Sequence, residues 1–94
     1  MSQFLKDMIM RKLKELSEAE LLHYAKQYGF SITQDEVRQI IHYLRHHPVD
    51  PFHAAGRLEL LKALSQITNL ETAKQAQALF TKMIQAYGLE HLFD

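Results

Sequence analysis

Two short stretches decide how this chain folds: LSEAEL at residues 16–21 and ITQDEV at residues 32–37. In each, a hydroxyl residue, Ser17 or Thr33, is followed three positions later by a glutamate. This spacing is typical of a capping box at the start of a helix. In it the hydroxyl accepts a hydrogen bond from the backbone amide of the glutamate, and the glutamate carboxylate accepts one from the backbone amide of the hydroxyl residue. An apolar residue stands on either side of each box, as in a hydrophobic staple. The sequence therefore predicts helices that begin directly after Ser17 and Thr33.

Other residues that typically start or end helices indicate the remaining helices. Thr68, with a glutamate three residues later, suggests a third capping box, and Asp50-Pro51 suggests a start with proline at the first helical position. Gly29 and Gly88 suit the left-handed position that ends many helices. Together these signals predict about five helices, at residues 3–15, 18–28, 34–46, 51–66 and 69–87, followed by a short turn over residues 89–93.

Apolar side chains recur three and four positions apart in every predicted helix. Such spacing places them on one face that packs against neighbouring helices. In the first helix this face comprises Leu5, Met8, Ile9, Leu13 and Leu16. No segment alternates in the manner of a strand. We therefore expect an all-α fold, a small bundle formed by a single helical domain over residues 1–94.

The composition excludes several classes of function. The chain has 94 residues, 11 basic and 11 acidic side chains, and no cysteine. Balanced charge makes nucleic-acid binding unlikely, because such proteins usually carry a basic excess. Disulfides and cysteine-based zinc sites are excluded, no membrane-spanning run of about 20 apolar residues occurs, and no signal peptide is evident. We expect a cytoplasmic protein that is not an enzyme and needs no cofactor.

A helix-turn-helix is the alternative interpretation of the predicted helices 18–28 and 34–46. The second of these helices would present Arg38, His42 and Arg45 on one outward face, as a recognition helix does. Asp35, however, stands where that motif places an apolar residue, and the connection is longer than the usual tight turn. Weak nucleic-acid binding through this face is therefore the second hypothesis.

Histidines are concentrated around the bend between the third and fourth predicted helices. His42 and His46 are four residues apart, a spacing that can place two imidazoles on one metal ion. Nothing in the sequence directs His47 or His53 to the same point, and imidazoles near a helix C-terminus are favoured without any metal. We therefore predict no metal site here.

His53 and Arg57 share the face of the fourth predicted helix that should point inward. One interpretation is a polar pocket at the bend that binds an anion or a carboxylate of a partner. The other is that both polar heads reach water at the edge of the core while their stems pack. The second is favoured because arginine is rarely buried without a partner.

Phe4 and Met10 lie on opposite flanks of the apolar face of the first helix. Large apolar groups outside a core face are what a partner protein or a second subunit covers. The same helix has a local basic excess, which would also suit a membrane surface, but its apolar face is needed to complete the bundle. The leading hypothesis is a non-enzymatic protein–protein interaction module with an unknown protein partner or a homodimer.

Three stretches resemble a known family. LLHYAKQY at residues 21–28, RLELLK at 57–62 and ETAK at 71–74 are similar to the YqfT-like family of short uncharacterised proteins from spore-forming bacilli. The resemblance extends from about Met8 to Lys82. It implies a small, helical, cytoplasmic bacterial protein, and it assigns no catalytic or binding residue.

Overall fold

The computed structural model describes residues 2–93, with side chains from residue 3 onward. It contains the five predicted helices followed by one 3₁₀ turn, and residues 2–93 contain no strand. The all-α prediction is confirmed. The elements in chain order are α1 (Ser2–Glu15), α2 (Glu18–Gln27), α3 (Gln34–His46), α4 (Ala54–Ile67), α5 (Leu70–Ala86) and the 3₁₀ helix η1 (Glu90–Leu92).

Both capping boxes form at the predicted positions. The Ser17 hydroxyl accepts the Glu20 amide at 3.1 Å, and the Glu20 carboxylate accepts the Ser17 amide at 3.0 Å. At the start of α3 the corresponding two distances are 3.1 and 2.8 Å. Because each box satisfies amides that the helix itself cannot pair, α2 and α3 begin where the sequence predicts.

The predicted helix ends at Gly29 and Gly88 are also confirmed. Gly29 and Gly88 have φ angles of 78° and 63°. After each glycine, the next amide donates back to a carbonyl in the last turn, with Phe30 to Ala25 at 2.8 Å and Leu89 to Ile84 at 2.9 Å. This is the Schellman arrangement, which requires a left-handed residue and therefore favours glycine.

The predicted start of α4 at residue 51 is wrong, because the helix begins at Ala54. Asp50 does not cap it. Its carboxylate instead accepts the amide of Phe52 at 3.1 Å and so closes a turn. Pro51 and Phe52 are buried in that turn. Aspartate followed by proline favours a turn as well as a helix start, and the burial of Phe52 decides between the two.

The predicted cap of α5 is displaced by one residue. Asn69 is the N-cap, and its side-chain oxygen accepts the amide of Thr72 at 2.8 Å. Thr68 instead donates its hydroxyl to the Leu64 carbonyl at 2.7 Å, at the end of α4. Asparagine is at least as good a cap as threonine, and Thr68 is already engaged with the preceding helix.

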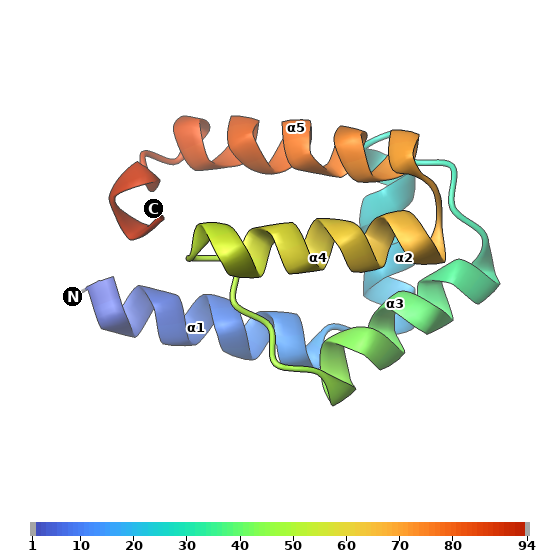
Figure 1. The fold of residues 1–94 in the computed structure, drawn as a ribbon, viewed down its shortest axis with the longest axis horizontal. Coiled ribbons are helices and arrows are strands. Elements are labelled where there is room, and N and C mark those ends of the chain that lie inside the picture. Colours follow the sequence, from blue (N-terminus) through green and yellow to red (C-terminus); the bar gives the residue numbers. More distant parts are fainter. Residues whose placement is uncertain (1, 94) are drawn as a thin grey trace.

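Helices α4 and α5 run side by side in opposite directions, α1 lies along the other edge of α4, and α2 lies behind (Figure 1). The core cluster consists of Ile41, Leu44 and Val49. Partly buried apolar side chains from α1, α2, α3, α4 and the α1–α2 connection pack against it: Met10, Leu13, Leu16, Leu21, Ile40 and Leu60.

The inward face of α1 differs from the predicted one. Met10, expected outside the core face, packs against the core cluster, whereas Met8, expected inside it, is exposed. The ammonium group of Lys14 is also directed at α3. It donates to the carbonyls of Leu44 at 2.8 Å and His47 at 2.6 Å, at the C-terminal end of that helix.

The connection between α1 and α3 is reciprocal. While Lys14 of α1 caps the end of α3, Arg45 of α3 donates to the Leu16 carbonyl just beyond the end of α1, at 3.3 Å. Helix C-termini leave carbonyls unpaired and carry a partial negative charge. Each helix therefore supplies a cation to the end of the other.

We expect Lys14→Met to destabilise the fold by about 1.5–3 kcal/mol, the usual range for hydrogen bonds that involve a charged group. Methionine keeps the apolar stem but leaves the Leu44 and His47 carbonyls without this donor. Urea denaturation followed by circular dichroism measures the change. The matched control is Lys12→Met, an exposed lysine of the same helix, which should change stability by less than about 0.5 kcal/mol.

Candidate functional site

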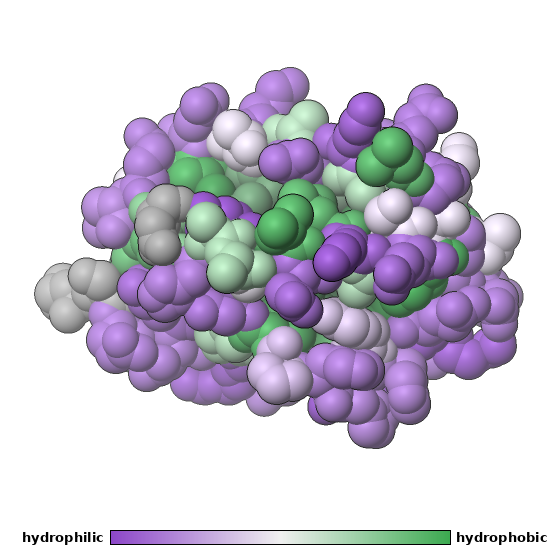
Figure 2. All heavy atoms as spheres, viewed as in Figure 1, coloured by the Kyte–Doolittle hydropathy of each residue, from purple (hydrophilic) through white to green (hydrophobic). Residues whose placement is uncertain are grey.

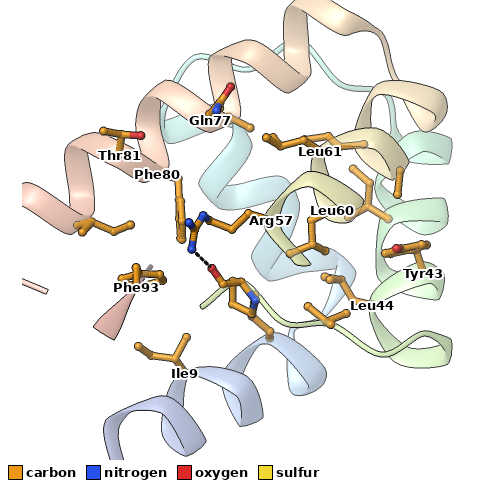
Figure 3. A pocket seen from close by; sticks show the side chains of 18 of the residues that line it. Ile9, Tyr43, Leu44, Arg57, Leu60, Leu61, Gln77, Phe80, Thr81 and Phe93 are labelled. Carbon is orange, nitrogen blue, oxygen red and sulfur yellow. Dashed lines mark hydrogen bonds between the residues drawn. The ribbon is translucent and has the colours of Figure 1, made fainter. Parts of the chain in front are cut away.

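An apolar cleft of about 540 Å³ lies between α1, α3, α4 and α5. Side chains from all four helices and from the C-terminal segment point into it (Figure 3). Its described lining includes one basic residue, Arg57, and one acidic residue, Glu90. This volume lies within the range of small-molecule sites, roughly 300–1,000 Å³.

Arg57 lies inside this cleft. Its guanidinium donates to the Pro51 carbonyl at 3.0 Å and stands 6.0 Å from the ring centroid of Phe93. Phe93 in turn contacts Phe52 and Phe80, with ring centroids 5.1 and 5.3 Å apart. Arg57 therefore joins the turn before α4 to the C-terminal segment.

His53 does not share the cleft with Arg57. It is exposed, does not line the cleft, and places Nδ1 2.6 Å from the Asp50 carboxylate. The structure thus brings only one of the two predicted pocket residues into an enclosed site. The expectation that both polar heads reach water holds for His53, whereas the Arg57 guanidinium is directed inward.

Two carboxyl groups have lowered pKa values. The Ser17 amide and hydroxyl hydrogen bonds lower the pKa of Glu20. At Asp50, desolvation raises the pKa, but the hydrogen bonds from His53 and from the Phe52 amide outweigh it, so the pKa is lowered overall. A lowered pKa in the folded state stabilises the fold above the unfolded pKa, and this contribution is lost as pH falls through the folded value.

We therefore expect stability to decrease as the pH falls below about 4, near the ordinary pKa values of Asp and Glu. Glu20→Gln keeps an acceptor for the Ser17 amide but removes the titrating group, so it should show a smaller loss of stability on acidification. The measurement is the urea midpoint at about pH 6 and about pH 3, on either side of this window. Equal losses in the variant and the unmodified chain would contradict the assignment to Glu20.

The side chains that were predicted to bind nucleic acid make contacts within the chain. Arg38 forms an ion pair with Asp35 at 3.1 Å, and Arg45 donates to the Leu16 carbonyl. The His42 ring stacks on His46 with centroids 4.1 Å apart. Pairing with an acidic side chain offsets the positive charge that phosphate binding requires. These contacts give no support to the nucleic-acid hypothesis.

The histidine-rich bend holds no converging ligand set. Within residues 2–93, no three histidine, aspartate or glutamate side chains are grouped so that they could hold a metal ion. His46 and His47 each place Nδ1 close to the carbonyl four residues earlier, at 2.9 and 3.2 Å. These contacts orient each ring along its own helix.

Four large apolar side chains are exposed on α1 and at α2, and we call them together the α1–α2 face. It consists of Phe4, Met8, Tyr24 and Tyr28, which are 67, 41, 48 and 41% exposed. Met8 and Tyr24 line the same hollow, together with apolar side chains of α1 and with Lys12, Glu15 and Glu20. Each pair of exposed residues is four positions apart on its helix and therefore shares a side.

Of the two predicted partner residues, only Phe4 belongs to this face. Met10 is turned to the core, as described above. Met8, which the apolar spacing of the first helix places on the core face, is exposed, and so are Tyr24 and Tyr28. The spacing of Phe4 and Met8 was the available sequence signal, because two apolar residues one turn apart outline a surface stripe.

Comparisons with known proteins assign this sequence to a family. A family model described as "Protein of unknown function (DUF2624)" matches residues 1–84. The chain belongs to the DUF2624 family. "Uncharacterized protein YqfT" of Bacillus subtilis (strain 168) is 35% identical over 72 residues, which cover 77% of this chain and 86% of the relative. The resemblance inferred from the sequence is thereby confirmed.

The DUF2624 match ends before the C-terminal segment. Leu92 and Phe93 lie beyond residue 84, yet Leu92 is only 2% exposed and Phe93 contacts the cleft residues described above. No solved structure matches the chain. Among residues 2–93, none of the helices has the length and apolar character needed to cross a membrane.

Proposed function

We propose that this protein is a non-enzymatic protein–protein interaction module that binds its partner through the α1–α2 face. The observation that carries the proposal is that Met8 and Tyr24, both exposed, line one hollow on α1 and α2, and that Phe4 and Tyr28 are exposed one turn away from them on the same helices. Single exposed apolar residues are ordinary, but a group of them around a recess is typical of a contact surface. Tyrosine and phenylalanine are also enriched at interfaces.

The ionisable groups support a role without catalysis. Several of these groups make contacts that serve the fold: Glu20 and Glu36 belong to helix caps, Arg38 forms an ion pair with Asp35, and His53 contacts Asp50. A reaction site instead brings a nucleophile or base to a recess with its orienting partner. We propose the cytoplasm as the location, consistent with a chain that has no cysteine.

Site-specific photocrosslinking tests the proposal. A benzophenone amino acid replaces Phe4 in one variant and Leu70 in a control, since both residues are exposed and Leu70 lies at the start of α5. Both variants are irradiated in extract of a Bacillus host. We expect a discrete protein adduct at position 4 and none at position 70. Equal labelling at both positions, or no adduct at position 4, would contradict the proposed face.

A further inference from the structure

The last described residues of the chain turn back onto the apolar cleft. Gly88 has a φ of 63°, and residues 89–93 lie between the end of α5 and the starts of α1 and α4 (Figure 1). We call residues 89–93 the C-terminal segment. Leu92 of this segment is buried, and Glu90 and Phe93 line the cleft. The segment therefore forms part of the cleft wall.

Phe93 lies between aromatic rings at one end of the cleft. Its ring centroid is 5.1 Å from that of Phe52 and 5.3 Å from that of Phe80. The Arg57 guanidinium stands 6.0 Å from the centroid of the same ring, and Figure 3 shows Arg57, Phe80 and Phe93 together at this end. Aromatic rings and a nearby cation attract a further ring through edge, offset and cation–π contacts. A different aromatic ring in the place of Phe93 makes the same kinds of contact.

The C-terminal segment is attached to the helices through few contacts. Beyond Leu89, the backbone hydrogen bonds described for the segment run within it, at 2.9 and 3.1 Å. Its described contacts with the helices are made by the side chains of Leu92 and Phe93. Release of the segment therefore requires the separation of two apolar side chains and breaks no ladder of backbone hydrogen bonds. Parts of a fold with so few buried contacts are among the first to open.

The cleft extends well beyond the place of Phe93. Its volume is about 540 Å³, and Figure 3 shows Leu61 and Tyr43, which also line it, far from Phe93. Figure 2 shows hydrophobic atoms between hydrophilic side chains in the middle of the molecule, where Figure 1 has α4 and α5. Small-molecule sites are apolar recesses of this size with a few polar groups. The cleft therefore has room for a molecule larger than one aromatic ring.

We propose that the cleft binds a small apolar molecule that carries an aromatic ring, and that the C-terminal segment competes with this ligand. The ring of the ligand takes the place of Phe93 beside Phe52 and Phe80, and the rest of the ligand lies along the cleft. Because the ring can enter only where the segment is released, the apparent affinity is reduced by the released fraction. This site is separate from the α1–α2 face and does not depend on the proposed function.

Titration of the full chain with anilinonaphthalene sulfonate, an aromatic probe of apolar sites, tests the proposal. Phe93→Ala removes the competing ring and keeps the buried Leu92. The probe should then bind at least about tenfold more tightly, as expected if the segment is closed in about nine of ten unmodified molecules. The matched control is His91→Ala in the same turn, an exposed residue whose loss should leave the affinity unchanged. Equal affinity of the Phe93 variant and the unmodified chain overturns the proposal.

A second change shows whether the probe lies in the cleft. Ala76 lines the cleft one turn before Phe80 on α5, so Ala76→Phe places a ring in the space that the ligand needs. Added to Phe93→Ala, this change should abolish the gain in affinity. Circular dichroism verifies that each variant retains its helices. A gain that persists in the double variant places the probe outside the cleft or on a loosened fold, and this overturns the proposal.

NMR of the unmodified chain tests the competition without any variant. In the free chain we expect nuclear Overhauser contacts between the rings of Phe93 and Phe80, whose centroids are 5.3 Å apart. Saturation with the probe should remove these contacts, because binding of the ligand and closure of the segment oppose each other to the same extent. Contacts that persist at saturation overturn the competition. A probe that does not bind to the unmodified chain or to the Phe93 variant overturns the ligand site itself.

Discussion

Gly56→Ala is expected to destabilise the fold by about 3 kcal/mol or more, the upper range for overpacking. A methyl group at this position would overlap the backbone carbonyl oxygen of Asp50, and the carbonyl carbon would lie 2.9 Å away. Both atoms belong to the turn that leads into α4, so the turn or the helix would have to move. In an ordinary exposed helix, the same change would stabilise by about 1 kcal/mol.

Urea denaturation of the Gly56→Ala and Gly29→Ala variants separates the loss of stability caused by steric crowding from the loss caused by backbone strain. Gly29 has a φ of 78° with nothing within 4 Å of the added carbon, so Gly29→Ala measures the strain of the left-handed conformation alone, about 1–2 kcal/mol. We expect the Gly56 variant to lose clearly more. If it equals or exceeds the unmodified chain in stability, the close approach to Asp50 is not a feature of the folded protein.

Leu92→Ala is expected to cost about 2–5 kcal/mol, the usual range for removing a buried leucine side chain. Leu92 is 2% exposed although it lies two residues from the end of the chain and outside the family match. Its loss would loosen η1 and the contacts of Phe93 with Phe52 and Phe80. The same denaturation experiment measures the change.

The control for this prediction is His91→Ala in the same turn. His91 is exposed, and such surface changes usually stay within about 0.5 kcal/mol. Similar losses for both variants would show that η1 as a whole, rather than the Leu92 side chain, holds this end of the chain.

Local signals in the sequence predicted those helix starts and ends that depend only on residues close to each other in the chain. The capping boxes at Ser17 and Thr33 and the glycine ends at Gly29 and Gly88 involve residues within six positions of each other. Their geometry is therefore set before any tertiary contact forms. The start of α4 was not predictable in this way, because the burial of Phe52 decides that the chain turns at Asp50.

The orientation of α1 was likewise not predictable from local signals in the sequence. A helical wheel treats Lys14 as a surface residue and places Met8 inward, but Lys14 pairs with carbonyls 30 and 33 residues away. Such a long-range contact leaves no mark in the local pattern. Phe4 is exposed, as its position off the apolar face predicted, whereas Met10, which the same pattern placed outside the core face, packs against the core cluster.

The reciprocal cations at the ends of α1 and α3 have a consequence for how the bundle opens. Lys14 and Arg45 fasten only the C-terminal end of α1. The N-terminal part of α1 has the weaker contact of Lys6 with the Phe52 ring, 5.5 Å from its centroid, so we expect local opening to start there and to hinge near Lys14. Amide hydrogens of the first turns should exchange with deuterium before those near the hinge. Because Ile9 and Leu13 belong to the wall of the apolar cleft, the same opening would expose the interior of the cleft to water.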